Sequence, residues 1–397
     1  MAEQAPPAAA AERRQLLVDI SVLARQDDKS GIQRVVRSVL HALRQAPPPG
    51  YRVATVYDAG GYYAYADGMA MAGAGAEPPI AVRRGDIFYG LDLSPLGVCA
   101  NAATLADLRR HGVRLYFMIY DLLPITRPQL FMAGAPVPYT AWLRTIAQLA
   151  DGLICISRAV ADDVLAWLEQ AAVCRSDPLE VSYCHLGADL LTAPASTGID
   201  AGDRQVLGAI AGRPALLMVG TLEPRKSQSQ ALDAFELLWR RGVDASLVIV
   251  GRAGWMVEAL VERLRQHSEL GRRLFWLDHA SDEMLLRLYQ ACSALLAASQ
   301  AEGFGLPLIE AAQHGLPVVA RDIPVFREVG GHHAFYFNAD DDAGLAEALT
   351  AWLDLHAQGR APASTAMPHL DWAASTAQIV DCLLQRRRYR RGATLMA

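Results

Sequence analysis

The chain has 397 residues, of which 52% are hydrophobic and 20% charged, and its formal net charge at pH 7 is −5. A chain of this length exceeds the size at which a single hydrophobic core keeps growing, so two domains are expected. The slightly acidic balance argues against general nucleic-acid binding, which needs a basic surface, and no apolar run approaches the roughly 18 residues of a membrane-spanning helix.

The first half of the chain alternates predicted strands with amphipathic helices, which is typical of a sheet covered by helices. The clearest helix is 32–44, where apolar residues recur with the helical period from Ile32 to Leu43. The predicted strands are 16–22, 51–57, 86–91, 113–120, 153–157 and 181–187, and the other predicted helices lie near Leu105 and at 139–150 and 158–170.

Ser30 and Gly31 precede the helix 32–44 and have two interpretations. They can be a simple helix start signal, or Gly31 can belong to a phosphate-facing loop at a cleft. The segment is not a nucleotide P-loop, because the Gly-Lys-Ser/Thr ending of that motif is absent.

Asp121 directly follows the predicted strand 113–120, within the sequence Tyr-Asp-Leu-Leu-Pro. Ligands of open parallel sheets bind beyond the carboxyl ends of the strands, so Asp121 is a candidate site residue. The alternative is that Asp121 only stabilises a turn or caps a helix.

The second half begins after a segment with several prolines and glycines, 193–212, which is predicted to be an interdomain linker. A second alternation of strands and helices follows it and predicts a second doubly wound sheet. The predicted strands are 215–220, 246–251, 274–277, 294–298 and 318–320, and the predicted helices are 230–241, one beginning at Met256, 281–290, 345–355 and one within 368–384.

Two adjacent cations, Arg225 and Lys226, follow the strand 215–220 and the pair Gly220-Thr221. At the carboxyl end of a strand they would neutralise a diphosphate, with Arg225 as a planar fork and Lys226 as a point charge. The alternative is a pair of solvated loop residues.

The stretch 299–322 predicts a strand, a glycine turn, a short helix and another strand. Gly303 and Gly305 permit a tight turn, and Pro307 suits the start of the helix, whose free N–H groups favour an anion such as phosphate. Glu302 stands in the turn, and Glu310 in the helix is able to accept hydrogen bonds from a ribose diol. The alternative is that Glu310 only favours the helix dipole and Glu302 is solvated.

The sequence Glu302-Gly-Phe-Gly-Leu-Pro, followed by Glu310, resembles the signature of retaining GT-B glycosyltransferases of family 4. The segment from Ser30 resembles the first loop and helix of mannosyl- and rhamnosyltransferase-like members. The resemblance implies that Glu302 contacts the transferred sugar and Glu310 holds the ribose. It also implies a phosphate clamp of Arg225 and Lys226 and a sugar-lining loop with Asp121, in which Tyr120 stands where many members have histidine. The donor-binding positions that it implies are Gly31, Gly220, Thr221, Arg225, Lys226, Gly303, Phe304, Gly305, Leu306 and Glu310.

The resemblance extends over 16–384 and implies a GT-B fold, with two doubly wound Rossmann-like domains that face a cleft. The predicted divisions are a disordered tail at 1–14, an acceptor domain at 15–192, a linker at 193–213, a nucleotide-sugar domain at 214–365, and at 366–397 a helix that returns to the first domain, followed by a basic tail.

The implied activity is transfer of a hexose from a nucleotide-sugar to a glycan or a lipid-linked glycan, with retention of the anomeric configuration. Mannose from GDP-mannose is the first choice of donor, and UDP-glucose and GDP-rhamnose remain alternatives. A non-catalytic glycan-binding or scaffold subunit is the alternative from another class. No cofactor and no metal are expected at the chemical step, since Arg225 and Lys226 supply the positive charge.

Two charged clusters remain. Asp340, Asp341 and Asp342 precede an apolar-periodic helix and are interpreted as its N-terminus rather than as a metal site. The arginine-rich segment 386–391 either favours a helix C-terminus or contacts an anionic membrane surface. Six scattered cysteines indicate reduced thiols, so we expect a cytoplasmic protein, with peripheral contact to the inner face of the plasma membrane as a further possibility.

Overall fold

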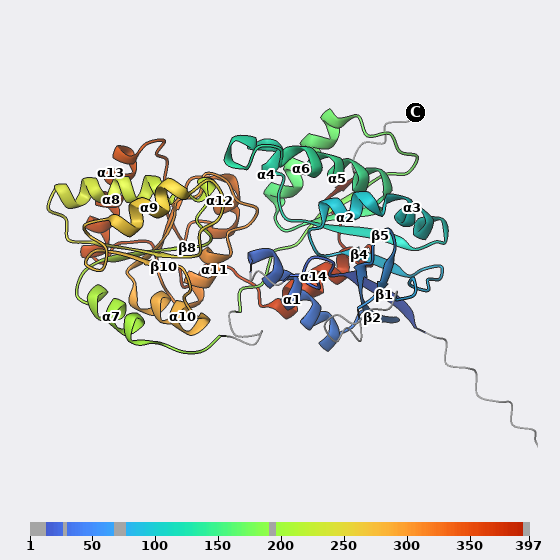
Figure 1. The fold of residues 1–397 in the computed structure, drawn as a ribbon, viewed down its shortest axis with the longest axis horizontal. Helices are drawn as coiled ribbons and strands as arrows, with labels where there is room; N and C mark the ends of the chain where they lie inside the picture. Colours follow the sequence, from blue (N-terminus) through green and yellow to red (C-terminus); the bar gives the residue numbers. More distant parts are fainter. Residues whose placement is uncertain (1–12, 27–29, 67–76, 190–195, 392–397) are drawn as a thin grey trace, which may run out of the picture.

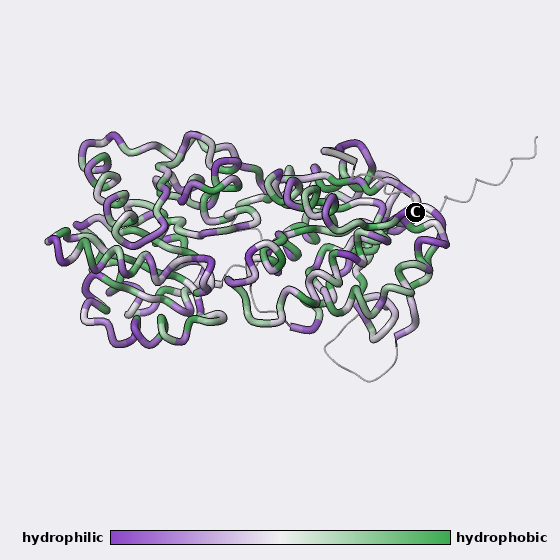
Figure 2. Tube along the Cα trace, turned by 90° about the horizontal axis from the view of Figure 1, so that it is seen from above, coloured by the Kyte–Doolittle hydropathy of each residue, from purple (hydrophilic) through white to green (hydrophobic). Residues whose placement is uncertain are grey.

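The structure is a computed structural model and describes residues 13–26, 30–66, 77–189 and 196–391. These residues form two α/β lobes, each built on one sheet, which lie side by side along the long axis of the molecule (Figure 1). In both lobes hydrophobic stretches run through the interior and polar stretches gather at the outer helices and loops (Figure 2).

The first lobe contains an eight-stranded sheet of order β14-β7-β6-β5-β4-β1-β2-β3. The neighbouring pairs from β7 to β2 are parallel, and the edge strands β3 and β14 are antiparallel to their neighbours. Its strands are β1 (Arg14–Asp19), β2 (Tyr51–Asp58), β3 (Tyr63–Tyr65), β4 (Ile87–Gly90), β5 (Arg114–Ile119), β6 (Gly152–Cys155), β7 (Glu180–Tyr183) and β14 (Arg390–Arg391). Its helices are α1 (Gly31–Gln45), α2 (Pro95–Ala100), α3 (Ala102–Arg110), α4 (Leu123–Thr126), the 3-10 turn η1 (Pro128–Leu130), α5 (Pro136–Leu149), α6 (Arg158–Ala171) and α14 (Trp372–Leu383).

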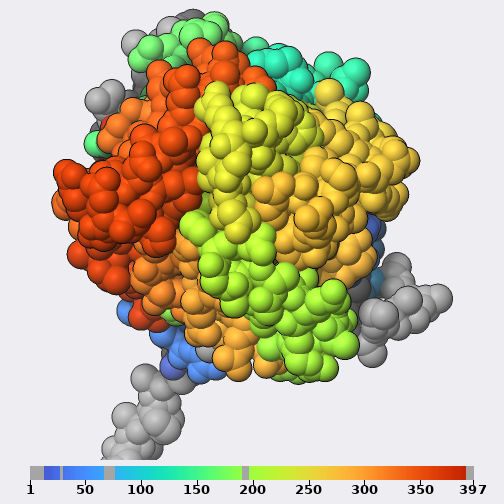
Figure 3. All heavy atoms as spheres, turned by 90° about the vertical axis from the view of Figure 1, so that its left-hand side faces the viewer, coloured from blue at the N-terminus to red at the C-terminus, as the bar shows by residue number. Residues whose placement is uncertain are grey.

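The second lobe contains a six-stranded sheet of order β10-β9-β8-β11-β12-β13, in which every neighbouring pair is parallel. On its outer face α8 lies between α13 and α9 (Figure 3). The strands are β8 (Ala215–Val219), β9 (Ser246–Val250), β10 (Leu274–Leu277), β11 (Ala294–Ala297), β12 (Val318–Arg321) and β13 (Phe335–Phe337). The helices are α7 (Ala201–Ile210), the 3-10 turn η2 (Pro224–Lys226), α8 (Gln228–Arg240), α9 (Glu258–Gln266), α10 (Asp282–Ala291), α11 (Leu306–Gln313), α12 (Pro324–Gly330) and α13 (Asp342–Ala357).

Both sheets are doubly wound, which confirms the predicted fold class. In the second lobe the chain begins in the middle at β8, adds β9 and β10 on one side, and then adds β11, β12 and β13 on the other. In the first lobe β1 has the same central place between β2 and β4. Such a reversal of strand order opens a crevice beyond the carboxyl ends of the two central strands.

Two of the predicted segments differ from the structure. The predicted linker contains helix α7, because Asp200 and Asp203 form a capping box that starts a helix there, and α7 packs against α10. Residues 193–195 of that linker lie outside the described residues. The predicted tail at 1–14 also lies outside them, apart from Arg13 and Arg14, and β1 already begins at Arg14.

The end of the chain lies against the first lobe, since α14 packs on α1 and β6 (Figure 1). Beyond α14 the arginine-rich segment is not a free tail. Its strand β14 pairs with β7, and the Tyr389 hydroxyl donates a hydrogen bond to Asp162 at 2.9 Å. The backbone of 386–391 therefore completes one edge of the sheet, while 392–397 lie outside the described residues.

Asp341 caps α13 by accepting a hydrogen bond from the Gly344 N–H at 2.8 Å, which confirms that this acidic cluster starts a helix. Among the helices of the described ranges, none is long and apolar enough to cross a membrane.

Candidate active site

The candidate site lies where the loops after β8 and β11 meet. These strands are hydrogen-bonded neighbours at the point where the strand order reverses, so their following loops share one crevice. The loop after β8 carries Arg225 and Lys226, and the loop after β11 carries Glu302. Residues that are far apart in the sequence thus come together because of the topology of the sheet.

The turn before α11 leaves the helix N-terminus open. Gly305 has a φ of +99°, and a Cβ at this position would lie 2.7 Å from the Phe326 ring, so only glycine fits. No side chain caps the helix. Pro307 has no N–H, and the Leu308 N–H donates to the Gly305 carbonyl at 2.9 Å, so an anion at this end would meet the Leu306 N–H. Lys226, Glu302 and Pro307 line a pocket in front of it.

Glu302 is held by both cations of the predicted clamp. Its Oε2 accepts a hydrogen bond from Arg225 Nη1 at 2.6 Å, and its Oε1 accepts one from Lys226 Nζ at 2.5 Å. The other terminal nitrogen of Arg225, Nη2, forms an ion pair with Glu223 Oε1 at 2.7 Å. At most 17% of each of these four side chains is exposed, so the cluster is largely removed from water.

The charges of this cluster change the pKa values of its carboxyl groups. Burial alone would raise the pKa of Glu302, but Arg225 and Lys226 lower it to about 2. Burial raises the pKa of Glu223 and of Asp121 above their ordinary values, although Arg225 acts on both in the opposite direction. Glu302 is therefore the carboxylate that most strongly keeps its negative charge.

Glu223 is a member of this network that the sequence analysis missed. Its side chain is 3% exposed and it directly contacts Arg225. The available signal was its position two residues before Arg225, in the same loop as the predicted clamp. An acidic residue so close to a buried arginine is a natural partner for it, since buried charges need a counter-charge.

Asp121 forms the predicted turn, and its role as a site residue stays a prediction. Its Oδ1 accepts a hydrogen bond from the Leu123 N–H at 2.9 Å, as a turn aspartate does. It also lies close enough to Arg225 and Glu302 for their charges to act on its pKa. The hydroxyl of the preceding Tyr120 is occupied, since it donates to the Leu91 carbonyl at 2.9 Å.

Glu310 is buried and meets a cation from the other lobe. The Tyr289 hydroxyl donates to Glu310 Oε2 at 2.6 Å, and Arg34 Nη1 of helix α1 lies 2.6 Å from Oε1. Neither Arg34 Nη2 nor Glu310 Oε1 has a well-directed hydrogen bond. Both oxygens of the carboxylate thus lie against protein groups, and the ribose contact of Glu310 stays a prediction. Arg34 and Tyr289 were not among the predicted site residues.

The remaining predicted positions differ in how they relate to the pocket. Gly220 backs the clamp, since a Cβ there would lie 3.4 Å from Lys226 Cε. Thr221 accepts a hydrogen bond from Gln228 through its carbonyl, and Leu306 is the first residue of α11. Ser30 forms a capping box with Gln33, so the helix-start interpretation of Ser30 and Gly31 is correct. A phosphate contact at Gly31 stays a prediction.

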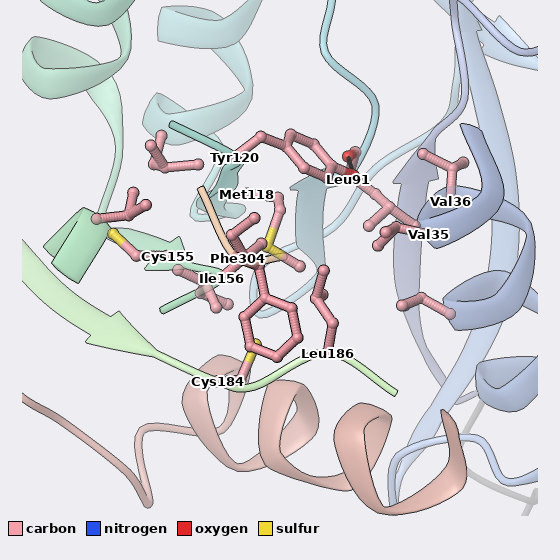
Figure 4. Close-up of a cluster of buried hydrophobic side chains, with 14 of the residues drawn as sticks. Val35, Val36, Leu91, Met118, Tyr120, Cys155, Ile156, Cys184, Leu186 and Phe304 are labelled. Atoms are coloured by element: carbon pink, nitrogen blue, oxygen red, sulfur yellow. Dashed lines mark hydrogen bonds between the residues drawn. The ribbon is translucent and has the colours of Figure 1, made fainter. Parts of the chain in front are cut away.

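The side chain of Phe304 lies elsewhere than the sequence analysis predicted. This side chain is 4% exposed and lies among buried side chains of the first lobe (Figure 4), and it is not among the residues that line the pocket beside Glu302. The Phe304 side chain therefore does not line this pocket, and a donor contact by its backbone stays a prediction. The physical reason is the proximity of the lobes, because a phenyl ring gains most by leaving water and the nearest apolar environment belongs to the other lobe.

A metal site is not evident in the parts of the chain that the structure describes, where no group of three or more His, Cys, Asp or Glu side chains is arranged to hold an ion. The groups that suit an anionic ligand are instead the side chains of Arg225 and Lys226 and the backbone at the start of α11.

Comparison with known proteins agrees with this geometry. Sucrose-phosphate synthase from Thermosynechococcus elongatus is 18% identical, with a TM-score of 0.64 over 94% of this chain and 99% of that chain. HepE of Anabaena, solved in complex with UDP, is 16% identical, with a TM-score of 0.63 over 94% of this chain and 100% of that chain. The fold is thus GT-B, the two-lobed class of glycosyltransferases.

Residues 201–365 match the family model of glycosyl transferases group 1, and the chain carries a domain of that family. The serotype-specific mannosyltransferase WbdA of Escherichia coli is 44% identical over 369 residues, which make up 91% of this chain. They make up 44% of WbdA, so the chain spans less than half the length of this curated relative.

The ion pair between the lobes leads to a prediction about stability. Replacing Glu310 by alanine leaves Arg34 largely buried without a counter-charge, and we expect the free energy of unfolding to fall by about 3 kcal/mol, the lower end of the range for a broken buried pair. Urea denaturation measures the change.

The double variant Arg34→Met with Glu310→Gln removes both charges and keeps a partner for Tyr289. It should recover most of that loss, because a buried ion pair contributes little net stability. Equal losses in the single and double variants would contradict the prediction.

Proposed function

We propose that this chain transfers a hexose from a nucleotide-sugar to a glycan or lipid-linked glycan, with retention at the anomeric carbon, in the synthesis of a cell-surface polysaccharide. The observation that carries the proposal is the cluster of Arg225, Lys226 and Glu302 beside the open N-terminus of α11. It combines two fixed cations for a diphosphate with one ionised carboxylate for the sugar.

The geometry suits a reaction without a protein nucleophile. The bond between the anomeric carbon and the diphosphate breaks as the acceptor oxygen bonds to that carbon from the same face, and the acceptor proton passes to the departing diphosphate. Arg225 and Lys226 stabilise the negative charge that grows on this leaving group. Glu302, which both cations hold in place, faces the positive charge that develops on the sugar.

GDP-mannose is the proposed donor and mannose the transferred sugar. The similarity to WbdA, a named mannosyltransferase, supports this choice. UDP-glucose and GDP-rhamnose are the alternatives that a direct comparison of donors tests. We also propose that the chemical step needs no divalent metal, because Arg225 and Lys226 take its electrostatic role. Transfer that disappears in EDTA and returns only with Mg²⁺ or Mn²⁺ would overturn this part.

The two glutamates should separate binding from chemistry. Glu310→Gln should weaken the affinity for GDP by about 10-fold or more, because hydrogen bonds to a charged group contribute about 1.5–3 kcal/mol in ground and transition states alike. Glu302→Gln should not weaken GDP binding, since it frees Arg225 and Lys226, but kcat should fall by about 100-fold or more. Calorimetry with GDP and UDP and steady-state kinetics measure both.

Glu347→Gln is the matched control, because Glu347 is exposed on α13 in the second lobe and should change neither quantity. The assignment is wrong if Glu302→Gln loses GDP binding while Glu310→Gln keeps it and loses turnover. Wild-type protein that binds GDP but never cleaves a nucleotide-sugar would favour the non-catalytic alternative.

We propose a cytoplasmic location with peripheral contact to an anionic membrane through Arg386, Arg387 and Arg388. Arg388 already pairs with Glu180 at 3.2 Å, and Arg387 lies 5.3 Å from the centre of the Tyr183 ring. Each exposed arginine contributes about 1 kcal/mol near such a surface, so these internal contacts reduce the expected effect.

Replacing the three arginines by glutamine should weaken binding to phosphatidylserine vesicles about 10-fold at low salt, as measured by co-sedimentation. The control replaces Arg240, Arg241 and Arg272, which are exposed on the second lobe, with the same change of net charge. Similar binding by both triple variants would remove the segment from the proposal.

A further inference from the structure

The turn that carries Glu302 is attached to the opposite lobe through Phe304. The Phe304 ring lies among Ile156, Cys184 and Leu186 of the first lobe (Figure 4). Its centre is 5.5 Å from that of the His185 ring. An aromatic ring from the donor-side turn is thus part of the hydrophobic core of the acceptor-side lobe.

The backbone of Gly303, beside Phe304, also contacts the first lobe. A Cβ on Gly303 would lie 2.0 Å from the carbonyl oxygen of Tyr120, so only glycine allows this approach. The Ser157 hydroxyl donates to the Gly303 carbonyl at 2.8 Å and also receives a hydrogen bond from the Val160 N–H at the start of α6. Ring, backbone and hydroxyl therefore dock the turn in one orientation.

This docking places the two halves of the site against each other. Glu302 directly precedes Gly303, and Asp121 directly follows Tyr120, whose carbonyl faces Gly303. Asp121 from the first lobe consequently comes within electrostatic reach of Arg225 in the second. If the turn were not docked, Glu302 would still lie beside Arg225 and Lys226 of its own lobe. It would no longer be fixed relative to Asp121 of the first lobe.

We propose that Phe304 is a positioning residue: its docking into the first lobe fixes Glu302 relative to the acceptor side, so that it sets the rate of sugar transfer and not the affinity for the nucleotide. The inference rests on the proposed function and names how that site is assembled. The ring itself touches no substrate, since it is enclosed by residues of the first lobe.

Other contacts also join the lobes, and one of them provides a matched control. The Phe131 ring of the first lobe stacks on the Trp255 ring of the second, with 5.8 Å between the ring centres. Trp255 Nε1 also donates to the Leu130 carbonyl at 3.1 Å. Phe131→Ala therefore removes a ring contact between the lobes without changing the turn that holds Glu302.

The test compares Phe304→Ala, Phe304→Leu and Phe131→Ala in the full chain. For Phe304→Ala we expect the Kd for GDP, measured by calorimetry, to change by less than about threefold, and kcat to fall by about 100-fold, the effect of a misplacement of about 1 Å at a reacting centre. Phe304→Leu should recover much of kcat because leucine still fills an apolar site, and Phe131→Ala should retain a larger share of kcat than Phe304→Ala.

Hydrogen exchange provides a readout that does not depend on activity. In Phe304→Ala, the amides of 120–123 and 303–306 should exchange faster, while those of β8 and β9 stay protected. If the wild type shows no sugar transfer, the proposed function fails. The hydrogen-exchange comparison still decides whether Phe304 docks the turn.

Loss of GDP binding together with kcat in Phe304→Leu would overturn the inference, because Phe304 would then belong to the nucleotide site. Unchanged exchange at 303–306 in Phe304→Ala would overturn it as well, because the turn would be held without the ring.

Discussion

The structure of the site depends on the ionised carboxylate of Glu302 between Arg225 and Lys226. Charged groups that lie out of water are stable only beside groups of opposite charge, and the distances of 2.6 and 2.5 Å meet that condition. Glu223 and Asp121 add two further acidic groups, whose pKa values burial raises. The cluster is therefore already organised in the protein alone, and a diphosphate bound as proposed here would have to share or replace the contacts that Glu302 makes.

The site is also divided between the lobes, so that neither lobe holds it alone. The second lobe supplies the clamp and the open N-terminus of α11. The first lobe supplies Asp121 at the end of β5 and Arg34 on α1, whose guanidinium reaches Glu310. Any relative movement of the lobes would separate these groups, which links the arrangement of the domains directly to the chemistry proposed here.

The described residues that flank the two chain passages between the lobes lie beside each other. The Ala188 N–H donates to the Leu370 carbonyl at 3.1 Å, and a Cβ on Gly187 would lie 2.6 Å from the Trp372 N. The start of the first passage, at Gly187 and Ala188, and the start of α14 are thus in direct backbone contact. Glu328 of α12 crosses nearby, where it accepts a hydrogen bond from the Arg158 N–H at 2.7 Å and lies 2.7 Å from His185 Nε2. These contacts join the lobes beside the two chain passages, and the docked turn around Phe304 joins them at the crevice.

The sequence by itself determined what depends on local order along the chain. Alternating strands and helices predicted both doubly wound sheets, and the motifs around Arg225-Lys226 and Glu302 implied a shared site through their resemblance to a family, because these signals are local in the sequence. Only the tertiary structure decided that the Phe304 side chain lies among residues of the other lobe and that Arg34 faces Glu310. Both outcomes depend on the distance between two separately folded sheets, and no periodicity or turn signal within either segment encodes that distance.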